Sequence, residues 1–232
     1  MLIGSGLLAK SFSYAHSRSE DVCIYAAGVS NSQCTDPREF EREHVRLSEA
    51  IQKAMHVGTF VYFGTCSVAD VETKGTPYVK HKLAMEHLAA QHPQYLIIRL
   101  PQVAGTTPNP HTLLNFLYAK IARSEAFGLW SNAKRNIIDV SDVASIVGQL
   151  LNDKALRCIT LNVANPTNYP MLKIVSVMES VIGKKAVYDV LDQGGEYPVD
   201  ISLMLPYLSK AQVNFGEDYL VKVINKYYGK IF

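Results

Sequence analysis

Short apolar runs alternate with longer amphipathic segments along most of the chain. The runs are rich in aliphatic and aromatic residues and end at glycine, proline or polar positions, as is typical of buried strands; they cover residues 21–28, 60–64, 95–101 and 158–163. Between and after them, apolar residues recur at helical spacing in segments 38–55, 78–92, 112–124 and 171–183. Strands that alternate with helices in this way predict an α/β fold built on a parallel sheet.

Composition limits the classes of protein that this pattern can belong to. The 232 residues are 48% hydrophobic and 19% charged, which is ordinary globular composition for one large domain or one with a small appendage. The net charge of +2 includes no block of like charges, so we expect no nucleic-acid partner. No segment is apolar for long enough to span a bilayer, and the first ten residues do not have the pattern of a signal peptide. The four cysteines form no C-x-x-C pair, so we expect reduced, buried thiols, a cytoplasmic protein and no metal site.

A glycine turn follows the first three residues. Gly4, Ser5, Gly6 and Leu7 begin the pattern G-x-G-x-x-A, which ends at Ala9 and leads into a helix expected to reach about residue 16. In this pattern the first glycine allows a tight turn and the second lets the backbone approach a pyrophosphate, while the alanine allows close packing of the helix on the strand. The turn therefore predicts a dinucleotide-binding site.

A second group of chemically active residues lies between positions 60 and 82. The strand 60–64 ends at Thr65, Cys66 and Ser67, and the following helix carries Tyr78 and Lys82 one turn apart. Residues four apart share a helix face, and a nearby cation favours phenolate, so we expect Lys82 to lower the pKa of Tyr78. The phenol and the strand-end hydroxyl of Thr65 could then hold a substrate oxygen between two donors.

Together these motifs resemble the extended short-chain dehydrogenase/reductase superfamily, in particular its NAD-dependent epimerase/dehydratase branch, which acts on nucleotide sugars. The resemblance covers nearly the whole chain and implies a Rossmann-like parallel sheet flanked by helices, with a small mixed C-terminal region that caps the substrate. It divides the chain into a dinucleotide-binding domain at residues 1–165 and a substrate-binding region at residues 166–232. It also implies catalytic roles for Tyr78, Lys82 and Thr65.

The resemblance also assigns contacts with cofactor and substrate. NAD or NADP would contact residues in the glycine turn, in the small-residue end of segment 21–28, on the catalytic helix and in segment 99–105: Gly4, Ser5, Gly6, Leu7, Ala26, Ala27, Gly28, Lys82, Pro101 and Val103. The nucleotide sugar would contact Thr65, Ser67, Gln102 and Arg135, with Arg135 on its diphosphate because a guanidinium suits phosphate geometry.

The N-terminal half departs from the family pattern. Only residues 17–20 separate the first predicted helix from the strand that begins at Asp21, whereas the family has two further strands and a helix there. One β-α-β unit takes roughly 30 residues, so the sequence predicts a shortened sheet. The carboxylate that usually binds the adenosine ribose is missing as well.

The resemblance implies hydride transfer at a sugar carbon. Dehydratases of this branch place two carboxylates directly after the catalytic threonine, where this chain has Cys66 and Ser67, so we expect 4-keto reduction or 4-epimerisation and not 4,6-dehydration. The main alternative is a non-catalytic protein that has lost tight cofactor binding. An atypical flavin or quinone reductase is disfavoured, because such proteins commonly lack the Tyr-x-x-x-Lys pair. By analogy with the family, we also expect a role in surface-polysaccharide synthesis and a homodimer built on helices 38–55 and 78–92.

Overall fold

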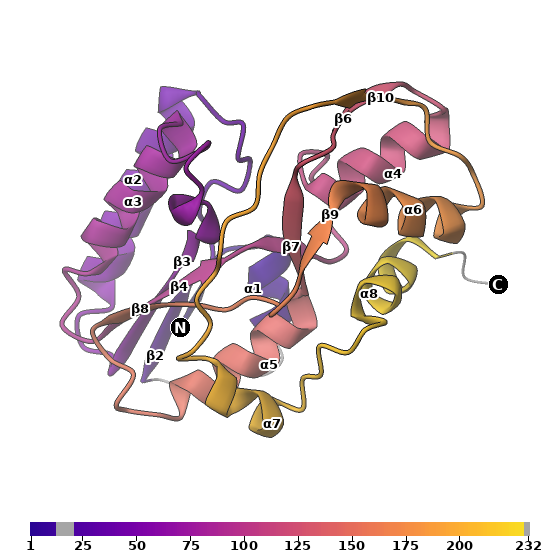
Figure 1. The fold of residues 1–232 in the computed structure, drawn as a ribbon. Helices are drawn as coiled ribbons and strands as arrows, with labels where there is room; N and C mark the ends of the chain where they lie inside the picture. Colours follow the sequence, from indigo (N-terminus) through magenta and orange to yellow (C-terminus); the bar gives the residue numbers. More distant parts are fainter. Residues whose placement is uncertain (13–20, 230–232) are drawn as a thin grey trace.

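A computed structural model describes residues 1–12 and 21–229, and its central feature is a five-stranded parallel sheet (Figure 1). The strand order is β1-β2-β3-β4-β8, and every neighbouring pair is parallel. The strands are β1 (Leu2–Ile3), β2 (Val22–Tyr25), β3 (Thr59–Thr65), β4 (Tyr95–Leu100) and β8 (Ile159–Asn162). The prediction of an α/β fold with a Rossmann-like parallel sheet is therefore confirmed.

Helices cover both faces of this sheet, and each face has its own hydrophobic core. On one face α1 (Leu7–Phe12) packs against α5 (Val140–Leu151), and the core includes Phe12. On the other face α2 (Pro37–Lys53) and α3 (Pro77–Ala89) pack against each other, and Leu47 of α2 is fully buried. The central strands are buried on both sides, which explains their continuous apolar sequences.

A smaller layer of helices and short strands lies beside the main sheet (Figure 1). A three-stranded sheet has the order β5-β7-β9, and β6 and β10 form a parallel pair. A further core joins this layer, and its elements are β5 (Gln102–Ala104), α4 (Leu113–Arg123), β6 (Phe127–Trp130), β7 (Lys134–Asp139), β9 (Asn168–Pro170), α6 (Met171–Ile182), β10 (Tyr188–Leu191) and α8 (Tyr219–Tyr228). The predicted division at residue 165 stays a prediction, since β7 on one side of it pairs with β9 on the other.

An extended segment after β10 runs between the main sheet and the smaller layer towards η2 (Leu205–Tyr207) and α7 (Leu208–Ala211) (Figure 1). It is held along its length by backbone and side-chain hydrogen bonds. The Lys134 amide donates to the Gly195 carbonyl over 3.1 Å, and the Asn162 amide group donates to the Asp200 carbonyl over 2.7 Å. These bonds place residues 193–201 at the boundary of the two layers.

The shortened sheet is visible at its edge. β1 pairs directly with β2, with Leu2 opposite Ile24 and Ile3 opposite Tyr25, and among the described residues no strand lies beyond β1. The C-terminal part of the predicted first helix, residues 13–16, lies outside the described residues.

Three local features add to or depart from what the sequence pattern indicates. The N-cap of α5 is Asp139, whose carboxylate accepts from the Ser141 amide over 2.7 Å, and Ser141 itself lies inside the helix. Cys158 is exposed at a positive φ of 58°, so only part of the prediction of buried thiols holds. Segment 95–101, expected as a strand, is β4 as far as Leu100, and the additional short strand β5 follows it because the chain leaves the main sheet at Pro101 to pair with β7.

Candidate active site

Two capping interactions bring the predicted catalytic residues to one edge of the sheet. Thr65 ends β3 and caps the short 3-10 helix η1 (Cys66–Ala69), since its Oγ1 accepts from the Ser67 amide over 3.2 Å. Thr76 caps α3 in the same way, and Pro77 occupies the first turn, where its fixed φ suits a helix start. Tyr78 therefore lies in the first turn of α3, one turn before Lys82.

These residues line a cavity of about 980 Å³ outside the carboxyl ends of the parallel strands. Ligands bind at this edge in open α/β sheets. The cavity is bounded by α3, the glycine turn and the loops after β2 and β4, and the predicted residues on its wall are Ser5, Gly6, Leu7, Ala26, Gly28, Thr65, Ser67, Tyr78, Lys82, Pro101, Gln102 and Val103. Twelve residues placed far apart in the sequence thus share one site.

Three predicted site residues are not part of the cavity wall. Gly4 and Ala27 lie directly behind it, and Gly4 has φ of +133°, with the position of an added Cβ only 2.3 Å from the Ala26 carbonyl oxygen. Arg135 lies on β7, where its Nη1 donates to the Lys134 carbonyl over 2.8 Å. The structure does not bring Arg135 together with Tyr78 and Lys82 on the cavity wall.

The glycine turn is compatible with a dinucleotide. A Cβ at Gly6 would meet no atom within 4 Å, so the backbone there is open to the cavity, whereas Gly4 is required by the turn itself. A cavity of about 980 Å³ is at the upper end of the usual range for ligand sites. The residues present therefore fit the pyrophosphate and nicotinamide parts of NAD or NADP.

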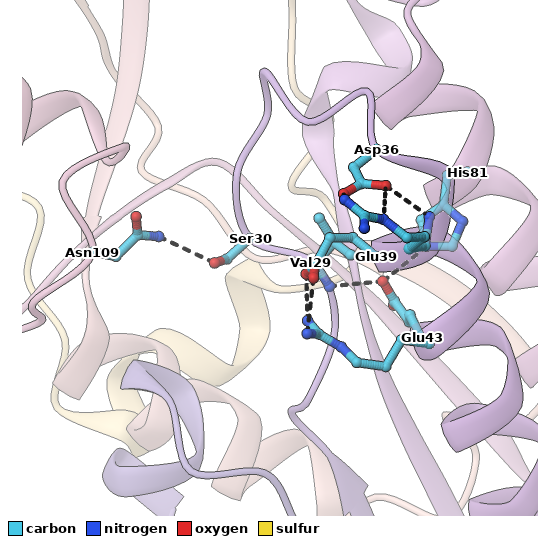
Figure 2. A network of polar contacts seen from close by, with 9 residues as sticks. Val29, Ser30, Asp36, Glu39, Glu43, His81 and Asn109 are labelled. Carbon is cyan, nitrogen blue, oxygen red and sulfur yellow. Dashed lines mark hydrogen bonds and ion pairs between the residues drawn. The ribbon is translucent and has the colours of Figure 1, made fainter.

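Sequence reasoning missed Glu43, which lies at the centre of the polar contacts beside this cavity (Figure 2). It projects from the inner face of α2 and is 2% exposed. Its Oε1 accepts from Tyr62 Oη over 2.8 Å and from Lys82 Nζ over 3.2 Å, and its Oε2 accepts from the Val29 amide over 2.7 Å and lies 2.9 Å from His81 Nε2. A glutamate on the apolar side of an amphipathic helix was the signal that could have revealed it.

The expected effect of Lys82 on Tyr78 is wrong for this arrangement. Burial raises the pKa of Tyr78 well above its usual value, and the negative charge of Glu43 raises it further, while the side chain of Thr65 lowers it in part. The ammonium of Lys82 is paired with Glu43, so its charge is largely cancelled at the phenol. Tyr78 is therefore a neutral phenol in the protein without ligands.

Glu43 remains ionised despite its burial. Burial alone would raise the pKa of its carboxyl, but the Lys82 charge and the hydrogen bonds from its neighbours outweigh burial and lower that pKa to about 2. A buried carboxylate is stable only with such pairing.

Ser67 lies on the cavity wall, and its neighbour in η1, Cys66, is buried. Burial raises the pKa of the Cys66 thiol to about 12, and its Sγ lies 3.8 Å from Asn162 Oδ1. The hydroxyl of Tyr197, on the segment after β10, interacts with the Ser67 side chain, and that interaction lowers a tyrosine pKa that burial raises. The segment after β10 therefore touches the loop that follows Thr65.

Two loops meet across another part of the cavity wall. Asn109 Nδ2 donates to Ser30 Oγ over 3.1 Å and so joins the loop after β5 to the loop after β2 (Figure 2). Asn115 at the start of α4 fixes the first of these loops, because its Nδ2 donates to the carbonyl oxygens of Thr107 and Asn109 over 2.9 and 2.7 Å. Groups of three or more metal-binding side chains are absent from the described residues, as are helices long and apolar enough to cross a membrane.

Comparison with known proteins agrees with this fold and site. Residues 12–164 match the NAD dependent epimerase/dehydratase family, so the chain belongs to that family. Its members share an NAD-type cofactor and the nucleotide-sugar epimerase/dehydratase fold. No curated protein sequence matches the chain.

Solved structures of the same fold are distant in sequence. UDP-glucuronic acid 4-epimerase from Bacillus cereus, in complex with UDP-glucuronic acid and NAD, is 19% identical with a TM-score of 0.74, and the match covers 90% of this chain and 74% of the epimerase. RMD from Pseudomonas aeruginosa, complexed with NADPH, is 15% identical with a TM-score of 0.71, and 97% of each chain is covered. A dTDP-glucose 4,6-dehydratase from Bacillus anthracis in complex with NAD is 17% identical with a TM-score of 0.68, and the match covers 88% of this chain and 71% of the dehydratase. At these identities the matches show the fold alone.

Proposed function

We propose that this protein is an NAD(P)-dependent oxidoreductase or epimerase that acts on a nucleoside-diphosphate sugar, by 4-keto reduction or 4-epimerisation. One observation carries the proposal: Thr65, Tyr78 and Lys82 line the same cavity as Ser5, Gly6 and Leu7 of the glycine turn. An acid/base group, a hydrogen-bond donor and a phosphate-binding turn are the parts that hydride transfer to or from a sugar carbon requires.

In this proposal Tyr78 exchanges a proton with the sugar oxygen. Thr65 donates a hydrogen bond to the same sugar oxygen as negative charge develops on that oxygen. The Thr65 hydroxyl proton can serve for this because Oγ1 only accepts in its bond with the Ser67 amide. Lys82 binds the nicotinamide ribose. The nicotinamide, when bound, supplies or accepts the hydride.

The substrate contacts are proposed for Ser67 and Gln102 on the cavity wall. Arg135 is proposed to contact the diphosphate only if the substrate extends beyond the cavity towards Tyr197. Arg135 is near Tyr197, since its charge lowers the pKa of that tyrosine. The C-terminal region at residues 166–232 would cap the sugar, because its segment 193–201 already touches the loop after Thr65.

Dehydration at C4 and C6 is disfavoured by the two residues that follow Thr65. Elimination of water needs an acid and a base beside the reacting carbons, and Cys66, with a pKa raised to about 12, exchanges protons poorly near neutral pH. Ser67 offers a hydroxyl, and its side chain interacts with the phenol of Tyr197. A 4,6-dehydratase product from a nucleotide-linked glucose would contradict this exclusion.

Removal of the phenol tests the acid/base assignment. We expect Tyr78→Phe to lower kcat by about 10²-fold or more while cofactor binding is retained, because the ring and the cavity remain and only the proton-exchanging hydroxyl is lost. Turnover is followed as loss of NADH or NADPH absorbance in a screen of nucleoside-diphosphate 4-keto sugars. Tyr95→Phe is the matched control. Tyr95 is the first residue of β4, whereas the cavity lies beyond the carboxyl end of that strand, so this variant should keep full activity. Near-normal turnover in Tyr78→Phe would remove Tyr78 from the mechanism.

A methyl group at Gly6 tests the cofactor site. The added Cβ meets no protein atom, so Gly6→Ala should leave the free energy of unfolding unchanged and weaken NADH or NADPH binding by about 10-fold or more, since the methyl group fills the path of the pyrophosphate. Calorimetric titration measures the affinity. Gly75→Ala, which also adds a methyl group into open space but away from the cavity wall, is the control. Equal affinities in the two variants would argue against this binding mode.

A non-catalytic binding protein is the second candidate, and the shortened sheet is the observation that favours it. With β1 at the edge, the described residues contain no strand that would carry the acid for the adenosine ribose. This candidate predicts no heat with NADH or NADPH at millimolar concentrations. The homodimer through α2 and α3, the cytoplasmic location and a role in polysaccharide synthesis stay predictions.

A further inference from the structure

Glu43 fills all its acceptor positions with donors from three different elements. Both carboxylate oxygens are used, one by Tyr62 and Lys82 and the other by the Val29 amide and His81, at 2.7 to 3.2 Å. Glu43 itself is 2% exposed and Lys82 is 3% exposed. A charged pair buried to this extent is costly to build and is destabilising when one partner is lost, so its geometry is fixed.

Glu43 lies behind the cavity wall at Gly28, and its partner Lys82 is part of that wall. A Cβ added there would lie 2.6 Å from Glu43 Oε1 and 2.9 Å from Lys82 Nζ, so only glycine lets the chain pass this close. On the other side Lys82 Nζ lies 4.5 Å from the centre of the Tyr62 ring, within range for a cation–π contact. Lys82 is thus held from three directions, by Glu43, Tyr62 and the backbone at Gly28.

This arrangement changes what a lysine one turn from a tyrosine does. An unpaired ammonium would favour the phenolate, whereas an ammonium neutralised by a carboxylate leaves burial to favour the phenol. At Tyr78 burial raises the pKa of the phenol most, the charge of Glu43 raises it further, and the hydrogen bond with Thr65 lowers it only in part. The pKa of Tyr62, whose phenol donates to Glu43 Oε1, is also raised by burial and by the charge of Glu43.

We propose that Glu43 is a positioning residue for proton transfer: it holds Lys82 against the Tyr62 ring and the Gly28 backbone, neutralises its charge, and keeps the Tyr78 hydroxyl as a proton donor to a keto sugar. This inference rests on the proposed function and selects the reductase over the epimerase. In the reduction, hydride from a reduced nicotinamide forms the new C–H bond, the Tyr78 O–H bond breaks, and its proton goes to the former keto oxygen. Tyr78 then regains a proton from water in the cavity. An epimerase must begin by removing a proton from an alcohol, for which a neutral phenol is the wrong form.

The titratable groups that face this pair come from the sheet and from both helices. On the sheet, Tyr25 donates to the Glu43 carbonyl over 3.4 Å, and Tyr62 donates to its carboxylate. The remaining charged or titratable groups acting on Glu43 or on these two tyrosines are Arg42, Arg46, Tyr78, His81, Lys82 and Glu86. Of these, Lys82 provides the largest attraction to Glu43, so its pairing dominates the charge state of the site.

Direct titration of Tyr78 tests the inference without substrate or cofactor. Tyrosines are labelled with ¹³C at Cζ, Tyr78→Phe assigns the Tyr78 resonance, and the resonance is followed with rising pH. In the wild-type protein Tyr78 should remain a phenol to the alkaline limit of folding. In Glu43→Gln the ionisation midpoint should fall by about one pH unit or more, because Lys82 is no longer neutralised. A Tyr78 resonance that behaves the same in both proteins would overturn the proposal.

Glu86→Gln is the matched control. Glu86 is also a buried glutamate, 5% exposed, and it lies on the same helix as Tyr78. It forms an ion pair with Arg99 over 2.7 Å and is not part of the cavity wall. Its loss should leave the Tyr78 midpoint unchanged. If Glu43→Gln does not fold, Glu43→Asp replaces it. This variant keeps the negative charge but moves it away from Lys82 by one methylene group, so the ionisation midpoint of Tyr78 should fall by less than in Glu43→Gln. An unchanged midpoint in Glu43→Asp would then overturn the proposal.

A second measurement distinguishes this inference from the proposed function. For a 4-keto sugar, kcat/KM of reduction should decline at high pH as Tyr78 ionises, and this decline should begin about one pH unit lower in Glu43→Gln. A uniform loss of rate with an unmoved pH profile would mean a purely structural role and would overturn the inference. If no keto sugar is turned over by any variant, the proposed function fails, and the Tyr78 titration still decides whether Glu43 controls the phenol.

Discussion

Among the described residues, two clusters combine a buried carboxylate with a lysine and a tyrosine, and one of the two borders the cavity. In the first, Glu43 joins α2 to Lys82 on α3 and to Tyr62 on β3. In the second, Asp139 at the start of α5 accepts from Lys226 over 2.7 Å and from Tyr227 over 2.8 Å, and so fixes α8. The residue types are the same, so residue type alone does not separate a functional cluster from a structural one.

The surroundings make the difference. The side chain of Lys82 is 4% exposed and lies on the cavity wall, whereas the side chain of Lys226 is 47% exposed. The charge of the first pair therefore acts on Tyr78 through a medium of low polarity, and the charge of the second is screened by solvent. A cluster that borders a cavity can control chemistry there, and a cluster at an interhelical contact contributes stability.

Loss of the Glu43 charge should have the largest effect on stability. Glu43→Gln leaves Lys82 buried without a counter-charge, and we expect a loss of about 3–5 kcal/mol in the free energy of unfolding, measured by urea denaturation. Asp139→Asn in the second cluster should cost clearly less, because its partner Lys226 is half exposed. Equal losses in the two variants would show that the clusters do not differ in burial as described.

Acid should remove part of the same stabilisation. The pKa of Glu43 is about 2 in the folded protein, against 4.5 for an ordinary glutamate, so its contribution is fully present above about pH 4.5 and is lost as the pH falls towards 2. The contribution is at most about 3 kcal/mol. Urea denaturation at several pH values should therefore show a steeper loss between pH 4.5 and 2 in the wild type than in Glu43→Gln. Parallel curves would contradict the lowered pKa.

The hydroxyl of Tyr219 should have the smallest effect of the three. It accepts from the Asp139 amide over 2.9 Å and donates to Asp142 over 2.5 Å, so Tyr219→Phe should lose about 1 kcal/mol of unfolding free energy. Cofactor affinity should not change, because neither Tyr219 nor its two partners are on the cavity wall. Weakened cofactor binding in Tyr219→Phe would mean that the second cluster is coupled to the site after all.

Much of the fold could be read from local patterns. Apolar runs bounded by Gly64 and Pro101, and the C-cap glycine Gly183 with φ of +73°, mark element boundaries to within a residue through short-range backbone preferences. The missing β-α-β unit followed from counting residues. The position of Arg135 on β7, away from the cavity wall, could not be predicted from the sequence. A match to a family motif does not say where that side chain lies in a chain with a shorter sheet.

The sequence by itself determined the α/β fold, the glycine turn, and the pairing of Tyr78 with Lys82 on one helix face, because each depends on residues that are neighbours along the chain. Only the tertiary structure decided the charge state of that pair. Glu43 lies 39 positions from Lys82 and reaches it because α2 and α3 pack side by side on the sheet. Electrostatic effects depend on distance in space and on burial, and neither can be read from separation in sequence.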